Sequence, residues 1–267
     1  MIRDITLGQY YQTDSVIHRL DPRVKLVATI AFLCSLFVVK NFIGYLIAAI
    51  FLGCMIKLSH VPFRYMIKGM RAIAFLLLIT FGFNLFLTPG EVVWSVWKLQ
   101  ITKEGIALAV KMAIRLTFLI IGSSVMTLTT TPNNLTDGME KLMKPLRIFK
   151  VPVHEVAMMM SIALRFIPIL LEETDKIMKA QMARGADFET GNLVKKAKNL
   201  VPLLVPLFIS AFRRANDLAM AMEARCYHGG EGRTKMKPLV YKARDRVAYF
   251  ILIGYFAMII ASRFAPL

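Results

Sequence analysis

The sequence predicts an all-α integral membrane protein with about five transmembrane helices and three cytoplasmic amphipathic coupling helices inserted before the last span. Two observations support this fold class. The 267 residues have a mean hydropathy of +0.57 and are 57% apolar, which is too apolar for an ordinary soluble domain. The chain also carries 34 Lys and Arg against 17 Asp and Glu. Because the sequence contains long apolar runs, we expect this positive charge to face a lipid bilayer, and we expect no nucleic acid as a partner.

Five apolar stretches are candidates to cross a bilayer, which requires about 20 residues per helix. They are 24–40, 41–57, 72–88, 105–131 and 247–262. The expected domains follow from them. Residues 1–131 form the N-terminal segment and the first four spans, residues 132–246 form the cytoplasmic coupling-helix region, and residues 247–267 form the final span.

Positive charge predicts the orientation. Residues 1–25, 57–71 and 132–246 hold four, four and twenty of the 34 Lys and Arg. The positive-inside rule therefore predicts that these segments face the cytoplasm of a bacterial cell, with the N-terminus inside and the C-terminus outside. Trp94 and Trp97 then fall in an outer loop, where aromatic side chains suit the headgroup region.

The region 132–246 contains two apolar stretches, at 156–171 and 200–212, that we interpret as parts of amphipathic helices and not as spans. The first includes Arg165, whose charge at a helix centre costs about 2.5–3.5 kcal/mol on insertion scales. The second contains two prolines and is followed by Arg213 and Arg214. Apolar residues recur at helical spacing and predict helices at about 153–184 and 199–226, after a shorter helix that starts near Pro132.

The residues give little support to catalysis or to a bound cofactor. The four His are scattered, the three Cys form no CxxC pair, and the Gly-rich stretch "HGGEGRTK" lacks the Gly-Lys of a phosphate-binding loop. We therefore expect no catalytic residues, no metal site and no cofactor. A stand-alone secondary transporter with a large cytoplasmic helical region is the alternative, but such a carrier usually has ionisable groups within its spans. Here the acidic residues lie almost entirely outside them.

A short motif occurs twice. Residues 182–187 read "MARGAD" and residues 223–228 read "EARCYH", so that Arg184 and Arg225 are separated by 41 positions and each ends a predicted helix. A single Arg near a helix C-terminus is ordinary, because it complements the partial negative charge there.

These motifs give the chain a resemblance to a known family. The opening "HRLDPRVKL" (18–26), the segment "MTLTTTPNNLTDGMEKL" (126–142) and the two Ala-Arg motifs resemble the transmembrane T component of energy-coupling factor (ECF) transporters. The resemblance covers nearly the whole chain. It implies a non-catalytic scaffold of an ATP-driven importer, which links two ABC ATPase subunits to a membrane-embedded substrate-binding S component for vitamin or micronutrient uptake.

The resemblance also implies sites. Ala183, Arg184 and Gly185 match a helix end that docks in one ATPase, and Ala224, Arg225 and Cys226 match the second, although the family signature has Gly where this chain has Cys226. The apolar faces of the long helices would receive the S component. The residues proposed for that interface are Met160, Ile167, Leu204 and Met222.

Overall fold

The structure is a computed structural model that describes residues 10–39, 41–96, 99–186, 188, 193–230, 234, 236 and 238–264. Its contacts divide the chain into two compact units. The first, called the bundle unit, comprises Gly8–Lys141 and Leu239–Leu267. The second, called the two-helix unit, is built from Leu142–Pro238. The two units are described separately below.

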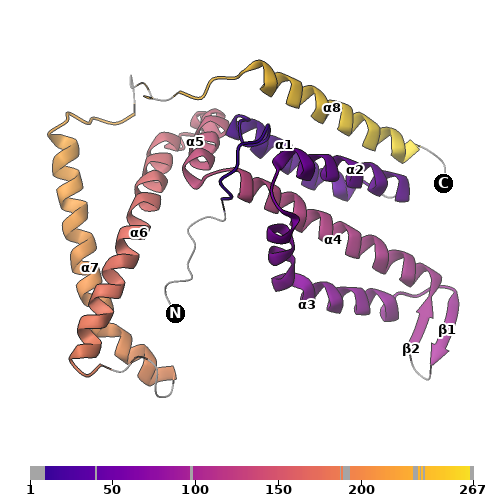
Figure 1. Cartoon of the computed structure of the whole chain (residues 1–267), viewed down its shortest axis with the longest axis horizontal. Coiled ribbons are helices and arrows are strands. Elements are labelled where there is room, and N and C mark those ends of the chain that lie inside the picture. Colours follow the sequence, from indigo (N-terminus) through magenta and orange to yellow (C-terminus); the bar gives the residue numbers. More distant parts are fainter. Residues whose placement is uncertain are drawn as a thin grey trace. The chain divides into compact units, whose positions relative to one another are not determined.

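The bundle unit contains six helices and one short hairpin among its described residues (Figure 1). In chain order these elements are α1 (Pro22–Val38), α2 (Phe42–Ser59), α3 (Phe63–Leu87), β1 (Val92–Val96), β2 (Leu99–Thr102), α4 (Lys103–Thr129), α5 (Pro132–Met143) and α8 (Ala243–Phe264). The two-helix unit contains the 3-10 helix η2 (Lys144–Phe149) and the long helices α6 (Val153–Ala183) and α7 (Leu193–Glu223). The protein is 79% helical with almost no strand, as an all-α membrane protein should be.

The long helices of the bundle alternate in direction. Lys25 near the start of α1 donates from Nζ to the carbonyl of Thr129 at the end of α4, at 2.8 Å. The backbone N–H of Asp21 donates to Asp245, at the start of α8, at 2.9 Å. At the opposite end of the bundle, Asn41 before α2 donates to the carbonyl of Ser262, at 3.3 Å. The starts of α1 and α8 and the end of α4 therefore share one end of the bundle, which we call the polar end.

The start of α3 lies at the polar end as well. The backbone N–H of Tyr11 donates to the carbonyl of Leu128 at 2.9 Å, and the ring of Tyr11 lies 5.1 Å from the ring of Tyr65. This arrangement brings the segments before α1, between α2 and α3, after α4 and before α8 to the same end of the bundle. They are the segments that the sequence predicts on one side of a membrane.

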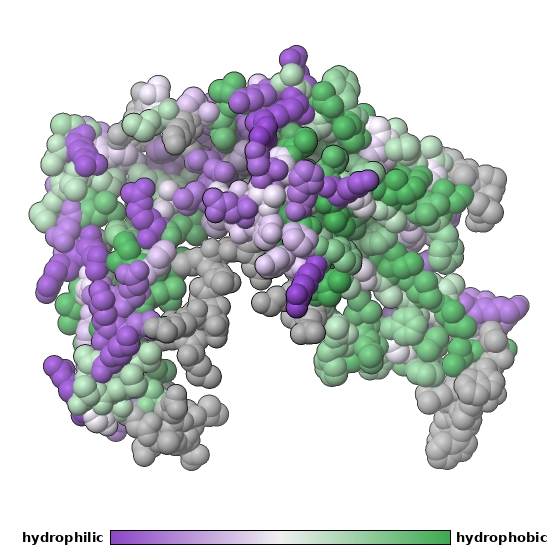
Figure 2. Space-filling model, in the orientation of Figure 1, coloured by the Kyte–Doolittle hydropathy of each residue, from purple (hydrophilic) through white to green (hydrophobic). Residues whose placement is uncertain are grey.

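The core of the bundle is apolar and aromatic. Tyr255 of α8 is buried, stacks on Phe51 at 4.3 Å between ring centroids, and shares a 2.7 Å hydrogen bond with Ser35 of α1. This hydrogen bond gives the buried phenol a polar partner, as a buried Tyr generally needs. The outer surface carries many exposed apolar side chains, and the face in Figure 2 is largely hydrophobic over α3, α4 and α8. A surface of this kind suits contact with lipid.

Within the described part of the chain, four helices are long and apolar enough to cross a membrane, namely α2, α4, α6 and α8. Three of them, α2, α4 and α8, correspond to predicted spans. α3 has a shorter apolar stretch, Ile73–Leu87, and α1 has 17 residues. Length and composition also admit α6, which we predicted to be an amphipathic coupling helix, and its placement is argued below from the direction of the chain.

Some helix bounds differ from those expected. α6 agrees within one residue with the predicted 153–184, but α7 begins at Leu193, six residues before the expected start. α3 begins at Phe63 and not near 72, because the basic residues of 63–71 lie on a helix that the apolar pattern alone did not reveal. The hairpin of β1 and β2 occupies the predicted outer loop, where the backbone of Trp94 pairs with Ile101. Trp97 lies outside the described residues.

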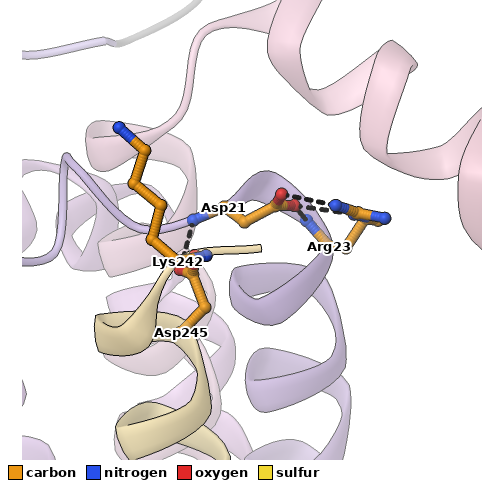
Figure 3. A network of polar contacts seen from close by, with 4 residues as sticks. All are labelled: Asp21, Arg23, Lys242 and Asp245. Atoms are coloured by element: carbon orange, nitrogen blue, oxygen red, sulfur yellow. Dashed lines mark hydrogen bonds and ion pairs between the residues drawn. The ribbon is translucent and has the colours of Figure 1, made fainter. Parts of the chain in front are cut away.

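A polar network holds the polar end together (Figure 3). The carboxylate of buried Asp245 accepts from the backbone N–H of Asp21 at 2.9 Å and from that of Lys242 at 2.8 Å. The carboxylate of Asp21 caps α1 by accepting from the N–H of Arg23 at 2.9 Å, and it also pairs with the guanidinium of Arg23 at 2.7 Å. That guanidinium lies 3.7 Å from the ring centroid of Tyr241, a cation–π contact. One carboxylate thus joins the start of α8 to the start of α1.

Helix α5 is held against the same place. A Cβ added at Gly138 would lie 3.0 Å from the Cβ of Pro22 and 3.3 Å from the side chain of Leu26, so α5 approaches α1 closely only because this position has no side chain. The chain leaves the bundle unit after α5 and returns just before α8. The chain is therefore held at the start of α1 at two points, at α5 where it leaves the bundle unit and at the start of α8 where it returns.

We expect Asp245→Ala to lower the free energy of unfolding by about 2–4 kcal/mol, because the buried N–H of Asp21 and the part-buried N–H of Lys242 would lose their acceptor. Thermal unfolding of the purified chain in detergent measures this change. Asp217→Ala, which removes an exposed carboxylate from α7, is the matched control and should stay within about 0.5 kcal/mol of the parent. Equal effects of the two substitutions would contradict the structural role of Asp245.

Stability should also fall in acid through Asp21. Burial raises the pKa of this carboxyl, but hydrogen bonds and the charge of Arg23 outweigh burial and hold the pKa below its ordinary value. Such a group stabilises the fold above its unfolded pKa of about 4, and this contribution is lost as the pH falls through the lower folded pKa. We expect Asp21→Asn to lose less stability than the parent on acidification below pH of about 4. An Asp217→Asn control should keep the parent's pH dependence, and an unchanged pH dependence in Asp21→Asn would contradict this account.

Candidate functional site

The two Ala-Arg motifs end α6 and α7 in the same backbone conformation. At the end of α6, the N–H of Ala186 donates to the carbonyl of Gln181 at 3.0 Å, and the N–H of Gly185 donates to that of Met182 at 2.9 Å. This pair of hydrogen bonds is a Schellman motif, which satisfies carbonyls that the helix end leaves without partners.

The end of α7 repeats this pattern residue for residue. The N–H of Tyr227 donates to the carbonyl of Met222 at 3.0 Å, and the N–H of Cys226 donates to that of Glu223 at 2.8 Å. In the first motif Ala183 is the last helical residue and Arg184 is the C-cap, whereas α7 ends one residue before its Ala, at Glu223. In both motifs the residue after the Arg adopts a positive φ. The repeated sequence therefore encodes a repeated helix end, which we call a tip.

Glycine and cysteine occupy the same left-handed position in the two tips. Gly185 has φ of +88° and Cys226 has φ of +53°. A Cβ added at Gly185 would meet no heavy atom within 4 Å, so the backbone conformation and not crowding favours glycine there. The second tip keeps the turn although Cys226 stands where the first tip has glycine. The cost is the strain of an L-residue in this region, about 1–2 kcal/mol.

Both arginines are accessible. Ala183, Arg184, Ala224 and Arg225 are all exposed, and neither guanidinium has an ion-pair partner among the residues that the structure describes. The fold therefore gains little from either arginine beyond its favourable position at the negative end of a helix. Each tip presents a positive charge behind a small residue.

An ion pair places the two tips symmetrically. Glu173 of α6 accepts from Nη2 of Arg214 at 2.5 Å and from the hydroxyl of Ser210 at 2.8 Å, both on α7. Arg184 follows Glu173 by eleven residues, and Arg225 follows Arg214 by eleven residues. Because α6 and α7 run in opposite directions (Figure 1), the tips lie on opposite sides of this ion pair, each about 16 Å away along its helix. The two tips therefore lie roughly 30 Å apart.

An apolar groove runs between α6 and α7 and has a volume of about 300 Å³. Its walls include Phe166 and Leu170 from α6 and Leu218 and Met222 from α7. Met222, a residue of the expected S-component interface, thus lines a surface between the two helices and is half-buried. Ile167 is also half-buried. Met160 and Leu204, in contrast, are exposed by 40% and 45%.

The exposed apolar surface of α7 is broader than the predicted stripe. Its middle part exposes large apolar side chains at successive helical turns, including Val201, Val205, Phe208 and Phe212. The residues expected at the S-component interface include Leu204 but none of these four, because they were chosen along a single 3.6-residue period. The run of apolar residues at 200–212 was the signal that could have revealed a second apolar face.

Comparison with known proteins gives a consistent result. A family model described as "Cobalt transport protein" (CbiQ) matches residues 13–236. A protein of Thermosediminibacter oceani named energy-coupling factor transporter transmembrane protein EcfT is 55% identical over 264 residues, which are 98% of this chain and 99% of that protein. Proteins of the same name from Clostridium kluyveri and Bacillus subtilis are 56% identical over 265 residues and 44% identical over 264 residues. The shared part is 98% of this chain in both cases, and 98% and 100% of the relatives.

Replacement of Cys226 by glycine should stabilise the second tip by about 1 kcal/mol, because glycine adopts a positive φ without steric cost. The measurement is amide hydrogen exchange of the peptide that covers residues 222–228, which should slow about fivefold. The reverse substitution, Gly185→Cys, should accelerate exchange at the first tip by a similar factor. If exchange at both tips were insensitive to these changes, the left-handed conformation at Cys226 would be wrong.

Proposed function

Since this chain belongs to the CbiQ family and is an energy-coupling factor transporter transmembrane protein of the EcfT type, we propose that its two tips dock the two ATPase subunits of an ECF importer. The observation that carries this proposal is the symmetry of the tips. Two equivalent helix ends, eleven residues beyond one ion pair and pointing in opposite directions, suit two similar partners. A scaffold that bound only one ATPase would need only one tip.

The direction of the chain supports a cytoplasmic location for both tips. α4 ends and α8 begins at the polar end, so the chain between them must cross the membrane an even number of times. Within the described part of that segment, α6 alone is long and apolar enough to cross. A single crossing by α6 would bring α8 to the wrong end of the bundle. We infer that α6 does not cross, and that residues 132–246 stay on the side of the polar end.

Charge identifies that side. Residues 1–25, 57–71 and 132–246, which the polar end brings together or connects, carry 28 of the 34 Lys and Arg. The positive-inside rule therefore places the polar end and both tips in the cytoplasm, where ATP and the ATPases are found, with the N-terminus inside and the C-terminus outside. The protein then contributes no catalytic residue, and its partners hydrolyse the ATP.

The exposed apolar faces of the long helices suit the S component. Met160 on α6 and Leu204 on α7 are exposed, and the neighbouring Phe208 and Phe212 enlarge the surface on α7. Exposed Met and Phe side chains can adapt to more than one hydrophobic partner. Ile167 and Met222 are half-buried and contribute less accessible surface. The substrate, a vitamin or another micronutrient, would be bound by the S component and not by this chain.

Arginine suits the proposed contact with an ATPase. An exposed ion pair contributes at most about 1 kcal/mol, whereas loss of one partner of a buried, hydrogen-bonded charge pair costs roughly 2–5 kcal/mol. Small residues beside Arg184 and Arg225 let a helix end enter a narrow groove in which a carboxylate is shielded from water. Such a contact can transmit movement from the ATPases to the membrane bundle.

We expect Arg184→Ala and Arg225→Ala each to weaken capture of the ATPases by about 2 kcal/mol, or roughly 30-fold in affinity. Thermal stability should not change, because both side chains are exposed. Arg213→Ala removes an exposed arginine from the body of α7 and is the matched control. Arg→Lys at either tip should be partly defective, because lysine keeps the charge but loses the planar fork.

Two measurements on the double Ala variant test whether the arginines dock the ATPases. The first is pull-down of the ATPases, and the second is uptake in reconstituted vesicles. Normal capture and coupled uptake in that variant would contradict the docking role and would show that both arginines are ordinary helix caps. Uptake by the chain alone, without ATPases, would instead support the stand-alone secondary transporter.

A further inference from the structure

The 3-10 helix η2 exposes two large apolar side chains between basic residues. Ile148 is 84% exposed and Phe149 is 77% exposed, which is unusual for such large apolar groups. Lys144 begins η2, and Lys150 ends it with φ of 60° and an N–H that donates to the carbonyl of Arg147 at 3.0 Å. Ile148 and Phe149 therefore lie exposed in this tight turn.

Residues 141–150 carry charge of one sign, since the segment begins directly after Glu140 and contains no acidic residue. Between Lys141 and Lys150 the chain has four basic residues, and the next acidic residue is Glu155. Apolar side chains flanked by lysines are typical of segments that lie in a membrane interface, where the apolar groups enter the acyl boundary and the ammonium groups stay among anionic headgroups. A protein partner with an acidic rim is a less economical explanation, because the membrane is already adjacent.

Chain length keeps η2 close to the membrane. Gly138 of α5 packs against Pro22 and Leu26 of α1 at the polar end of the bundle. η2 begins six residues after Gly138, and six extended residues reach at most about 20 Å. The segment therefore cannot move far from the headgroup layer at the polar end, which the proposed function places on the cytoplasmic side. That leaflet is rich in anionic lipid and attracts basic segments beside a span.

We propose that residues 144–150 form an interfacial anchor, which inserts Ile148 and Phe149 into the cytoplasmic leaflet and binds anionic phospholipid headgroups through Lys144 and Lys150. The anchor lies directly before α6. It would hold the start of that helix at the membrane while the tip at Arg184 follows the ATPase. The inference rests on the proposed cytoplasmic location of the polar end.

Tryptophan fluorescence tests the anchor in the full chain. The two native residues, Trp94 and Trp97, are replaced by Phe, and Phe149→Trp then provides the only fluorophore. The protein is placed in nanodiscs whose lipids are brominated on the acyl chain near the headgroup, with or without phosphatidylglycerol. We expect emission in anionic discs to fall by about half relative to unbrominated discs of the same charge. Met236→Trp, at a position that is 98% exposed, is the matched control and should keep its emission.

Charge dependence completes the test. Lys144→Gln with Lys150→Gln should remove most of the quenching in anionic discs, and discs without anionic lipid should give weaker quenching than anionic ones. An unquenched fluorophore in anionic discs, or quenching that ignores both charge changes, would overturn the anchor. Shielding of the fluorophore only after the S component or the ATPases are added would also overturn it, in favour of a protein contact.

The same samples separate this inference from the proposed function. ATPase capture by the Phe149→Trp chain is measured in parallel. Normal capture with an unquenched fluorophore refutes the anchor alone, whereas quenching without any capture by the parent chain refutes the docking of ATPases and leaves the anchor in place.

Discussion

The shared carboxylate of Asp245 is the interaction on which the arrangement of the protein depends. It caps the start of α8 and accepts the backbone N–H of Asp21, so that the last helix is joined to the first at the polar end. The close approach of α5 at Gly138 fastens the outgoing chain to the same place. The chain is therefore held at the start of α1 both where it leaves the bundle unit after α5 and where it returns before α8. A loose connection at either point would let the two-helix unit move without the membrane helices.

Within the two-helix unit, the ion pair of Glu173 and Arg214 has a comparable role. Both partners are partly exposed, so the pair adds little to stability, but it sets the register in which α6 and α7 cross. That register leaves each tip eleven residues beyond the crossing. Under the proposed function, two ATPases bound at the tips would act on the unit from opposite sides of this central contact. The ion pair therefore fixes the relative position of α6 and α7 and adds little to their stability.

The sequence predicts the bundle well because its information is local. Each apolar run lies within a short window of the sequence, and the bundle helices follow from these runs. The contact of Asp21 with Asp245 spans 224 residues and has no local signature. The early start of α7 was missed because the expected start was placed at the apolar run, although the preceding Lys195, Lys196 and Lys198 are good helix formers. The left-handed conformation of Cys226 is indicated in the sequence only by its parallel with Gly185, because cysteine itself does not favour a positive φ.

The measurement that tests the central claim most directly is photocrosslinking from the tips within the assembled transporter. A photoreactive amino acid is placed at Ala183 or at Ala224, each beside its arginine, and the crosslinked partner is identified by mass spectrometry. The account predicts that both positions crosslink to ATPase subunits, and that a probe at Asp217, on the body of α7, does not. Crosslinks from both tips to lipid, to the S component or to this chain itself would contradict it.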